Sequence, residues 1–457
     1  MSSLLNRIKV RIKATENPFI IAIAKHSPKY LGASVFSGVV ALVMTKYYTH
    51  VFDPAVYGTL ALYTTLFQYM QNFIGFSVDT SAQRVYFDYE GEERREFLGT
   101  TLLFITASAV FWIVVSAAFA PLAVRFMGGS IWMYATTVAL TTVYMFTNFF
   151  IRMAYNEHRS TLIARRGVLQ TVMNHVASVF LIAVAKLGIL GYQLGSVFSY
   201  LVTGLAYRRN LAAEGQLKVK WKFRTDIMKR LGHFAVPAFF TTVIGASLSY
   251  LDRVFLQAFH GATQVGIYSL GATIGAGMSL VIEAVALAVF PSLMRELDAD
   301  YDVNINKLKR FDLWFWLGLL GTATVIYLAR YPIVVLLSNK SYALAAEILP
   351  IVVLTLVLGG MYKVVSGVLS YHGIVRFYPA LTVVSFGTTA ILDWLLIPRY
   401  NELGAALATF LGFLVYSFVI HFIARKYYFK VSRMIAVYGT ILVMGLFMFW
   451  RALPAFR

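Results

Sequence analysis

The sequence has no cysteine and few charged residues. The complete lack of cysteine in 457 residues excludes disulfides, thiolate metal sites and cysteine nucleophiles. Charged residues make up 13% of the chain, against about 25% in soluble domains. The motifs of serine hydrolases, zinc proteases, P-loop proteins and dinucleotide-binding enzymes are also missing. We therefore expect neither an enzyme nor a bound cofactor or metal.

Apolar residues, in contrast, are abundant in the chain. They make up 59% of the chain, and the mean hydropathy is +0.69. A bilayer crossing needs about 20 apolar residues, so the sequence predicts an all-α polytopic membrane protein with no room for a large soluble domain. The predicted spans are 29–50, 56–78, 97–120, 130–152, 161–187, 188–207, 231–257, 265–293, 311–337, 342–371, 376–397, 402–424 and 432–451.

The basic residues indicate how the chain crosses the membrane. If the N-terminus is cytoplasmic, 30 of the 40 lysines and arginines lie in cytoplasmic segments. The positive-inside rule therefore predicts a cytoplasmic N-terminus and, with 13 spans, an external C-terminus. The net charge of +19 is explained by this topology, and we expect no nucleic-acid partner.

A repeated pattern divides the chain into two halves. Lys46 and Arg253 each lie six residues before a phenylalanine. Each phenylalanine leads through a short turn to a glycine, Gly58 or Gly266. We therefore predict two pseudo-symmetric six-helix bundles plus one extra C-terminal helix, because paired bundles create a cleft that can open to either side. The expected parts are a cytoplasmic amphipathic segment (1–28), an N-terminal bundle (29–207), a basic cytoplasmic linker (208–230), a C-terminal bundle (231–424) and a basic loop with the extra helix (425–457).

Charged residues inside the spans are candidates for function, because a charge at mid-bilayer costs about 2.5–3.5 kcal/mol on insertion scales. Lys363 and Glu283 lie well inside the tenth and eighth spans, and they form either a structural pair or part of a wet cleft. Arg253 and Lys46 lie toward the outer ends of their spans, where they either reach the interface or face each other across the cleft.

Other charged groups lie near span ends. Arg84 and Arg152 are either positive-inside anchors or the first contacts of a pyrophosphate that loads from the cytoplasmic leaflet. The candidates for ion coupling or for paired carboxylates are Asp252, Glu283, Asp79 and Asp393. We interpret the many tyrosines chiefly as interface belts, with sugar stacking as the alternative.

Three segments resemble bacterial polysaccharide-export flippases of the multidrug, oligosaccharidyl-lipid and polysaccharide (MOP) superfamily. The first is FDPAVYGTLALYTTLFQYMQNFIGFSVDTSAQRVYFD, which starts at Phe52. The second is the pair Asp252-Arg253 followed by GIYS from Gly266, and the third is NELGAALATFLGFLVYSFVIHFIARK from Asn401. Family members usually have 12 or 14 spans, so the expected 13 departs from the pattern.

The resemblance implies a flippase of the bacterial inner membrane. Such a protein moves an undecaprenyl-diphosphate-linked oligosaccharide to the outer leaflet by alternating access, for O-antigen, capsule or exopolysaccharide synthesis. Its partners would be this glycolipid and membrane lipids, with proton or sodium coupling left open. The expected cationic cleft consists of Arg253, Lys363, Lys46, Arg84 and Arg152. The alternative is an ion-coupled exporter of drugs or metabolites, and a glycan polymerase is disfavoured because the external loops are short.

Overall fold

The computed structural model describes residues 18–157, 159–213, 215, 218–299, 301–374, 377–426 and 431–456. Within these ranges the chain is predominantly helical and has no strands, as expected where a bilayer forces the backbone to satisfy its own hydrogen bonds. The expected surface segment lies partly outside this description, and its remainder belongs to the first long helix, which begins at Pro18.

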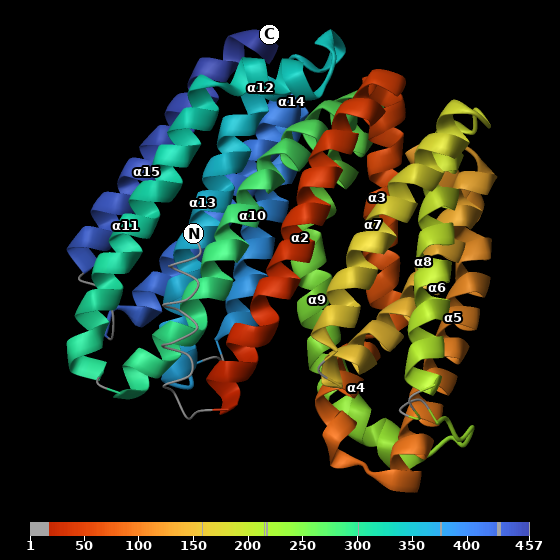
Figure 1. Cartoon of the computed structure of the whole chain (residues 1–457). Coiled ribbons are helices and arrows are strands. Elements are labelled where there is room, and N and C mark those ends of the chain that lie inside the picture. Colours follow the sequence, from red (N-terminus) through yellow and green to blue (C-terminus); the bar gives the residue numbers. More distant parts are fainter. Residues whose placement is uncertain are drawn as a thin grey trace, which may run out of the picture.

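The helices form two bundles and one additional helix (Figure 1). The first bundle contains α2 (Pro18–Val51), α3 (Pro54–Gly75), α4 (Val78–Val85), η1 (Tyr86–Asp88), α5 (Gly91–Met127), α6 (Ile131–Asn156), α7 (Ser160–Ala183) and α8 (Gly188–Ala213). The second contains α9 (Thr225–Phe259), α10 (Ala262–Ala299), α11 (Tyr301–Leu328), α12 (Arg330–Leu337), η2 (Lys340–Tyr342), α13 (Ala345–Tyr371) and α14 (Tyr378–Ala424). The additional helix is α15 (Val431–Ala452), which ends in η3 (Leu453–Phe456).

Helix α14 contains two predicted spans. Its backbone leaves the helical conformation at Asn401, where φ is 49° and ψ is −132°. Asparagine tolerates positive φ better than most residues, so it suits this kink. The predicted spans 376–397 and 402–424 thus lie on either side of Asn401.

Eight helices within the described residues are long and apolar enough to cross a membrane: α5, α8, α9, α10, α11, α13, α14 and α15. The predicted spans 29–50, 56–78, 130–152 and 161–187 fall in α2, α3, α6 and α7, which run alongside these helices in the bundle (Figure 1). Several polar side chains of these four helices line cavities inside the protein.

Local signals in the sequence fix the start of α3. The side chain of Asp53 accepts a hydrogen bond of 2.9 Å from the backbone nitrogen of Val56, and Pro54 occupies the first helical position. Both are favourable at a helix N-terminus. At the other end of α3, Phe76 and Ser77 have positive φ, which separates α3 from the short α4.

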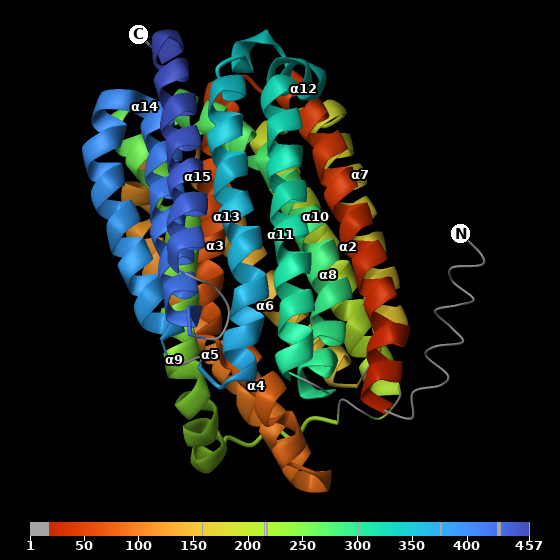
Figure 2. The same ribbon diagram turned by 90° about the vertical axis from the view of Figure 1, so that its left-hand side faces the viewer.

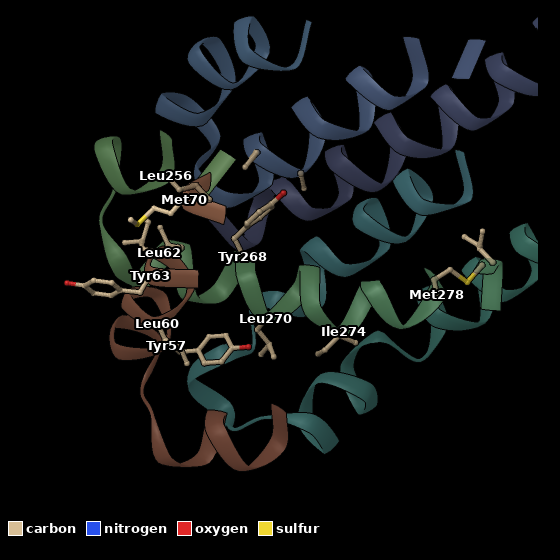
Figure 3. Packing of buried hydrophobic residues seen from close by; sticks show 14 of the residues in the cluster. Tyr57, Leu60, Leu62, Tyr63, Met70, Leu256, Tyr268, Leu270, Ile274 and Met278 are labelled. Atoms are coloured by element: carbon tan, nitrogen blue, oxygen red, sulfur yellow. The ribbon is translucent and has the colours of Figure 1, made fainter. Parts of the chain in front are cut away.

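The hydrophobic core is continuous across the two bundles. Tyr57 and Leu60 on α3 belong to the same buried cluster as Leu270 and Ile274 on α10, and Figure 3 shows these side chains where the two helices meet. In lipid, such contacts stabilise the structure mainly through close packing rather than through removal of apolar surface from water.

The two ends of the molecule differ. We call the end with α4, η1 and residues 218–224 the linker end, and the opposite end, with α12 and η2, the α12 end. Figure 2 shows the linker end with α4 next to the lower part of α9, so the bundles meet there.

Candidate functional site

A cavity of about 210 Å³ lies between the two bundles. Helices α2, α3, α7 and α8 of the first bundle and α9 and α10 of the second bundle line it. Hydroxyl groups and aromatic rings dominate its wall. The lining residues are Ala41, Thr45, Tyr48, Tyr57, Leu60, Ala61, Thr64, His175, Tyr192, Tyr250, Arg253, Ser269 and Thr273.

Arg253 is the one predicted cation in the wall of this cavity. Its Nε donates to the hydroxyl of Ser269 at 3.1 Å, and its Nη1 donates to the carbonyl oxygen of Ser249 at 2.9 Å. The guanidinium also lies 5.0 Å from the ring centre of Tyr250, a cation–π distance. These contacts hold a single orientation of the side chain, so the site offers a fixed positive charge.

Asp252 supports this arginine from the buried side. Its carboxylate accepts hydrogen bonds from the hydroxyl of Tyr268 and from the backbone nitrogen of Arg253, the second at 2.7 Å. The guanidinium Nη1 lies 3.5 Å from a carboxylate oxygen of Asp252. The carboxylate therefore offsets the cost of placing Arg253 in the membrane.

A second cavity, of about 120 Å³, adjoins the first and shares Leu60, Thr64 and Tyr192 with it. Gln68, a residue of its wall, donates a hydrogen bond of 2.9 Å to the hydroxyl of Tyr250 and so bridges the bundles. The remaining lining residues are Tyr63, Phe67, Thr137, Leu140, Asn174, Gln193, Ser196 and Tyr200. Together the cavities form a path rich in hydroxyl and amide groups.

The position of these tyrosines differs from the preferred interpretation of the sequence. Tyr48, Tyr57, Tyr63, Tyr192 and Tyr200 lie inside the protein rather than in a belt at the membrane surface. Composition alone does not distinguish the two positions. The signal that separates them is the helical spacing of Tyr57, Tyr63 and Thr64 with Leu60 on α3, which places polar groups on the inner face.

Two other cations expected to line the cleft, Lys46 and Lys363, lie outside the wall of this cavity. Lys46 is exposed and is not part of the cavity wall, although it occupies the position equivalent to Arg253. Lys363 forms an ion pair with Glu283, with 27% of the lysine side chain and 57% of the glutamate side chain exposed. The sequence left two alternatives for Lys363 and Glu283, a structural pair or part of a wet cleft. The contact between them corresponds to the pair.

The remaining charged candidates lie near the linker end. The Nε of Arg152 lies 2.6 Å from the carboxylate of Asp79, which also accepts a 2.6 Å hydrogen bond from Asn148. A second nitrogen of Arg152 donates to Gln83 at 2.9 Å. Arg84 is exposed, and its guanidinium lies 4.2 Å from the ring centre of Phe234 on α9. Structural contacts thus use two of the three side-chain nitrogens of Arg152.

Asp393 is the fourth carboxylate candidate, and it is fully buried on α14. Neither of its oxygens has a hydrogen-bond partner among the described residues. An ionised carboxylate in such surroundings is very costly, so the group is stable there only as a neutral acid or beside a cation. Asp393 does not line either cavity.

Contacts between the bundles close both ends of this region. At the linker end, Arg230 of α9 pairs with Asp88 at 2.8 Å, and the rings of Phe76 and Phe239 stack with centroids 4.3 Å apart. At the α12 end, the backbones of α3 and α10 touch at Gly58 and Gly266. The site therefore lies between two contact zones, each of which joins the two bundles.

Comparisons with known proteins agree with this architecture. The family described as polysaccharide biosynthesis protein matches residues 29–296, and the MatE family matches residues 237–395. None of the curated protein sequences compared with the chain matches it.

Solved structures of transporters share the fold. The lipid II flippase MurJ in an inward closed conformation is 14% identical and has a TM-score of 0.72. The match covers 91% of this chain and 90% of the MurJ chain. The Vibrio cholerae MATE transporter VcmN in the bent form is 17% identical, with coverage of 92% and 99% and a TM-score of 0.56. A MOP superfamily transporter from Pyrococcus furiosus is 16% identical, with coverage of 89% and 95% and a TM-score of 0.61.

The match to the polysaccharide biosynthesis protein family extends over more than half of the sequence and includes most of the first bundle together with α9 and most of α10 of the second. The likenesses to MurJ and to the MATE transporters show a shared fold with paired helix bundles. The chain therefore belongs to the polysaccharide biosynthesis protein family and has the transporter fold of the MOP superfamily.

Proposed function

We propose that this protein is a flippase that moves an undecaprenyl-diphosphate-linked oligosaccharide from the cytoplasmic to the outer leaflet of the bacterial inner membrane. The product would enter the synthesis of O-antigen, capsule or exopolysaccharide. In this proposal the linker end is cytoplasmic, in keeping with its basic residues.

The observation that carries the proposal is the position of Arg253. Its guanidinium lines a cavity between the bundles and is held in place by Ser269, Ser249 and Tyr250. Guanidinium groups bind phosphate oxygens through paired, charge-assisted hydrogen bonds. A fixed arginine at this position gives the diphosphate a counter-charge as it passes through the membrane.

The rest of the wall suits a sugar. The hydroxyls of Thr64, Tyr48 and Tyr57 and the amides of Gln68 and Asn174 offer donors and acceptors within the adjoining cavities. Tyrosine rings also provide flat apolar faces. In this account the second cavity holds the sugar nearest to the diphosphate.

The cavities are small, which implies movement. At about 210 and 120 Å³ they are below the roughly 300–1,000 Å³ of ordinary ligand pockets. The described arrangement has room for only part of a glycolipid head group, so the bundles must separate to load it. The contact zones at the two ends are the points where separation would open each side in turn.

Asp393 is our candidate for ion coupling. A buried carboxylate without a hydrogen-bond partner among the described residues gains stability from a proton or a sodium ion. Asp393 lies on α14, which packs against α9, the helix that bears Arg253. Loading or release of an ion could therefore shift α9 against the first bundle.

An ion-coupled exporter of cationic drugs is the second candidate, because the MatE family matches residues 237–395. Such a substrate needs a free carboxylate in the cavity. Asp252 is hydrogen-bonded to Tyr268 and to the backbone of Arg253, and Asp393 does not line the cavity. The charged group predicted for the cleft that lines this wall, Arg253, is a cation, so the geometry favours an anionic substrate.

The test is export of surface glycan by cells whose own copy of the gene is deleted. Cells that produce Arg253→Ala should lose most surface glycan, and Arg253→Lys should retain part of it, at membrane abundance equal to the parent. Arg399→Ala is the matched control, because Arg399 is an exposed arginine of the same half. Normal glycan with Arg253→Ala, or a deletion strain that changes only in drug susceptibility, would refute the proposal.

A further inference from the structure

Residues 218–224 form a non-helical segment, the strap, that leads into α9 and crosses the start of α5. Its sequence, KVKWKFR, alternates basic and apolar residues. The basic side chains contact α5, whereas Val219 and Trp221 line a cavity, so the strap has a basic face and an apolar face.

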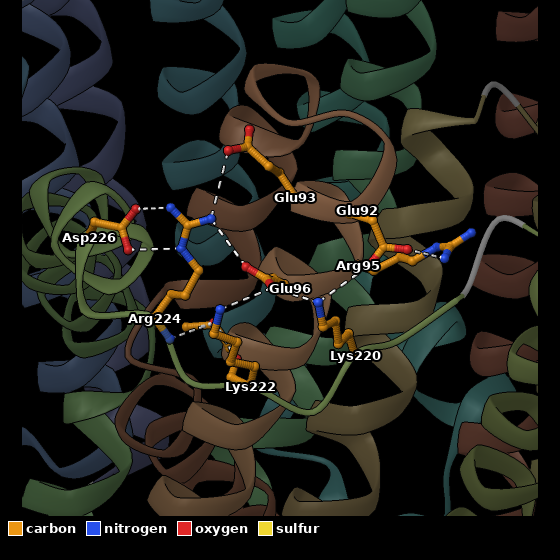
Figure 4. Close-up of polar contacts among 9 residues, drawn as sticks. Glu92, Glu93, Arg95, Glu96, Lys220, Lys222, Arg224 and Asp226 are labelled. Carbon is orange, nitrogen blue, oxygen red and sulfur yellow. Dashed lines mark hydrogen bonds and ion pairs between the residues drawn. The ribbon is translucent and has the colours of Figure 1, made fainter.

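The basic face is fixed to α5 (Figure 4). Lys220, Lys222 and Arg224 surround Glu96, with nitrogen–oxygen distances of 2.9, 3.2 and 3.2 Å. The hydrogen bond to Glu96 raises the pKa of Lys220 above its usual range. The backbone is held as well: the nitrogen of Lys220 donates to the carbonyl oxygen of Arg95 at 3.0 Å.

This attachment requires a glycine on α5. A Cβ at Gly99 would lie 1.9 Å from the carbonyl oxygen of Lys220, so no other residue allows the strap to approach so closely. The hydroxyl of Thr100 donates to the carbonyl oxygen of Lys222 at 3.0 Å and accepts from the backbone nitrogen of Arg224 at 3.1 Å. The strap is thus a built element of the first bundle.

The apolar face of the strap covers a cavity of about 470 Å³, which is separate from those between the bundles. Val219 and Trp221 line it together with Leu102 of α5, Phe146 of α6 and Leu205 of α8. Leu205 is 54% exposed and Trp221 is 66% exposed, so the cavity opens on the outer surface of the bundle. Large apolar groups exposed on a membrane protein indicate contact with lipid.

One cation lies in the wall of this apolar cavity. Arg208 of α8 lines it, is exposed, and forms no ion pair within the described part of the chain. Arginine and tryptophan together are typical of the depth at which lipid head groups meet acyl chains. Basic clusters next to a membrane span also attract anionic lipids.

We propose that this cavity binds one acyl chain of an anionic phospholipid, with its phosphate at Arg208 and Trp221 beside its glycerol region. The occupant is a lipid of the leaflet at the linker end. The volume suits an acyl chain, the wall is apolar, and the cation lies where the head group would be. The proposal does not depend on the transported substrate, because the cavity belongs to the first bundle alone.

The experiment is native mass spectrometry of the purified full chain with dioleoyl phosphatidylglycerol or dioleoyl phosphatidylcholine, which have identical tails. The parent should retain phosphatidylglycerol preferentially. Arg208→Glu should weaken its retention at least about fivefold, since each basic residue near a membrane contributes about that factor. Arg209→Glu is the matched control, because Arg209 is equally basic and exposed but does not line the cavity.

A second variant tests the apolar part. Val143→Trp places bulk in the cavity wall and should reduce retention of both lipids, whereas Val176→Trp on the exposed surface of α7 should not. Equal loss with Arg208→Glu and Arg209→Glu, or equal retention of the two lipids by the parent, would overturn the proposal. Retention of undecaprenyl phosphate but not of phosphatidylglycerol in an Arg208-dependent manner would also overturn it, because the cavity would then hold the tail of the substrate.

Discussion

Gly58 of α3 and Gly266 of α10 lie against each other's backbone where the two bundles meet at the α12 end. A Cβ on Gly58 would be 1.8 Å from the carbonyl oxygen of Ala262, and a Cβ on Gly266 would be 1.9 Å from that of Pro54. Real Cβ atoms do not approach so closely, so both helices require glycine at this crossing. The two residues occupy equivalent positions in the repeat, which makes the crossing nearly symmetric.

We predict that Gly266→Leu separates the bundles at the α12 end. The cavity lined by Arg253 should then open to that side. The chain has no cysteine, so a single Thr64→Cys substitution in the cavity wall reports on access. Labelling of this cysteine from the outside by a membrane-impermeant maleimide should increase severalfold. Gly359→Leu is the control, since a Cβ at Gly359 meets nothing within 4 Å. Equal labelling in all three proteins would show that the crossing does not close the cavity.

The Lys363–Glu283 contact predicts the outcome of a charge swap. If the pair is structural, Lys363→Glu should lower the Tm and glycan export because it places two like charges together. The double variant with Glu283→Lys should recover both. A double variant that regains its Tm but exports no glycan would instead identify Lys363 as a substrate-binding residue.

Arg152 and Asp79 form a pair near the linker end, and Asp79 is buried. Removal of the arginine leaves a buried charge without its partner, which typically costs about 3–5 kcal/mol. Because 29% of the arginine side chain is exposed, we expect a smaller loss for Arg152→Ala, about 1–3 kcal/mol. Chemical unfolding in detergent measures it. The double variant Asp79→Asn with Arg152→Gln should be more stable than Arg152→Ala; if it is less stable, the pair is not the cause.

Asp393→Asn should abolish the coupling of transport to an ion gradient without lowering the stability of the protein. The substitution removes a buried acid that lacks a hydrogen-bond partner among the described residues, so the Tm should be unchanged or higher. In reconstituted vesicles, an imposed proton or sodium gradient should no longer accelerate transport by this variant. Acceleration equal to that of the parent would exclude Asp393 as the coupling group.

The sequence predicts the helices well because long apolar stretches have few alternatives in a membrane. The predicted span 97–120 lies within α5, and even the division at 397–402 coincides with the kink at Asn401. Pairing inside the membrane was also predictable for Lys363 and Glu283, since isolated charges there are costly. These predictions follow from the free energy of placing individual apolar or charged side chains in the membrane.

Contacts between distant segments were harder to predict. Nothing near Arg152 in the sequence indicates that its guanidinium binds the carboxylate of Asp79, which is 73 residues away. The repeat placed Lys46 opposite Arg253, but a small rotation of a helix decides whether a side chain faces the cavity or the surface. The tyrosines of the two cavities illustrate the same limit, because amino-acid composition does not show which face of a helix is buried.

The most direct test of the account is binding of the glycolipid at Arg253. Purified parent protein should retain an undecaprenyl-diphosphate-linked oligosaccharide, as measured by native mass spectrometry. Loss of a charge-assisted phosphate contact should weaken binding by Arg253→Ala at least about tenfold, with Arg253→Lys in between and Arg399→Ala unchanged. Retention by Arg253→Ala equal to the parent would contradict the central claim that this arginine binds the diphosphate.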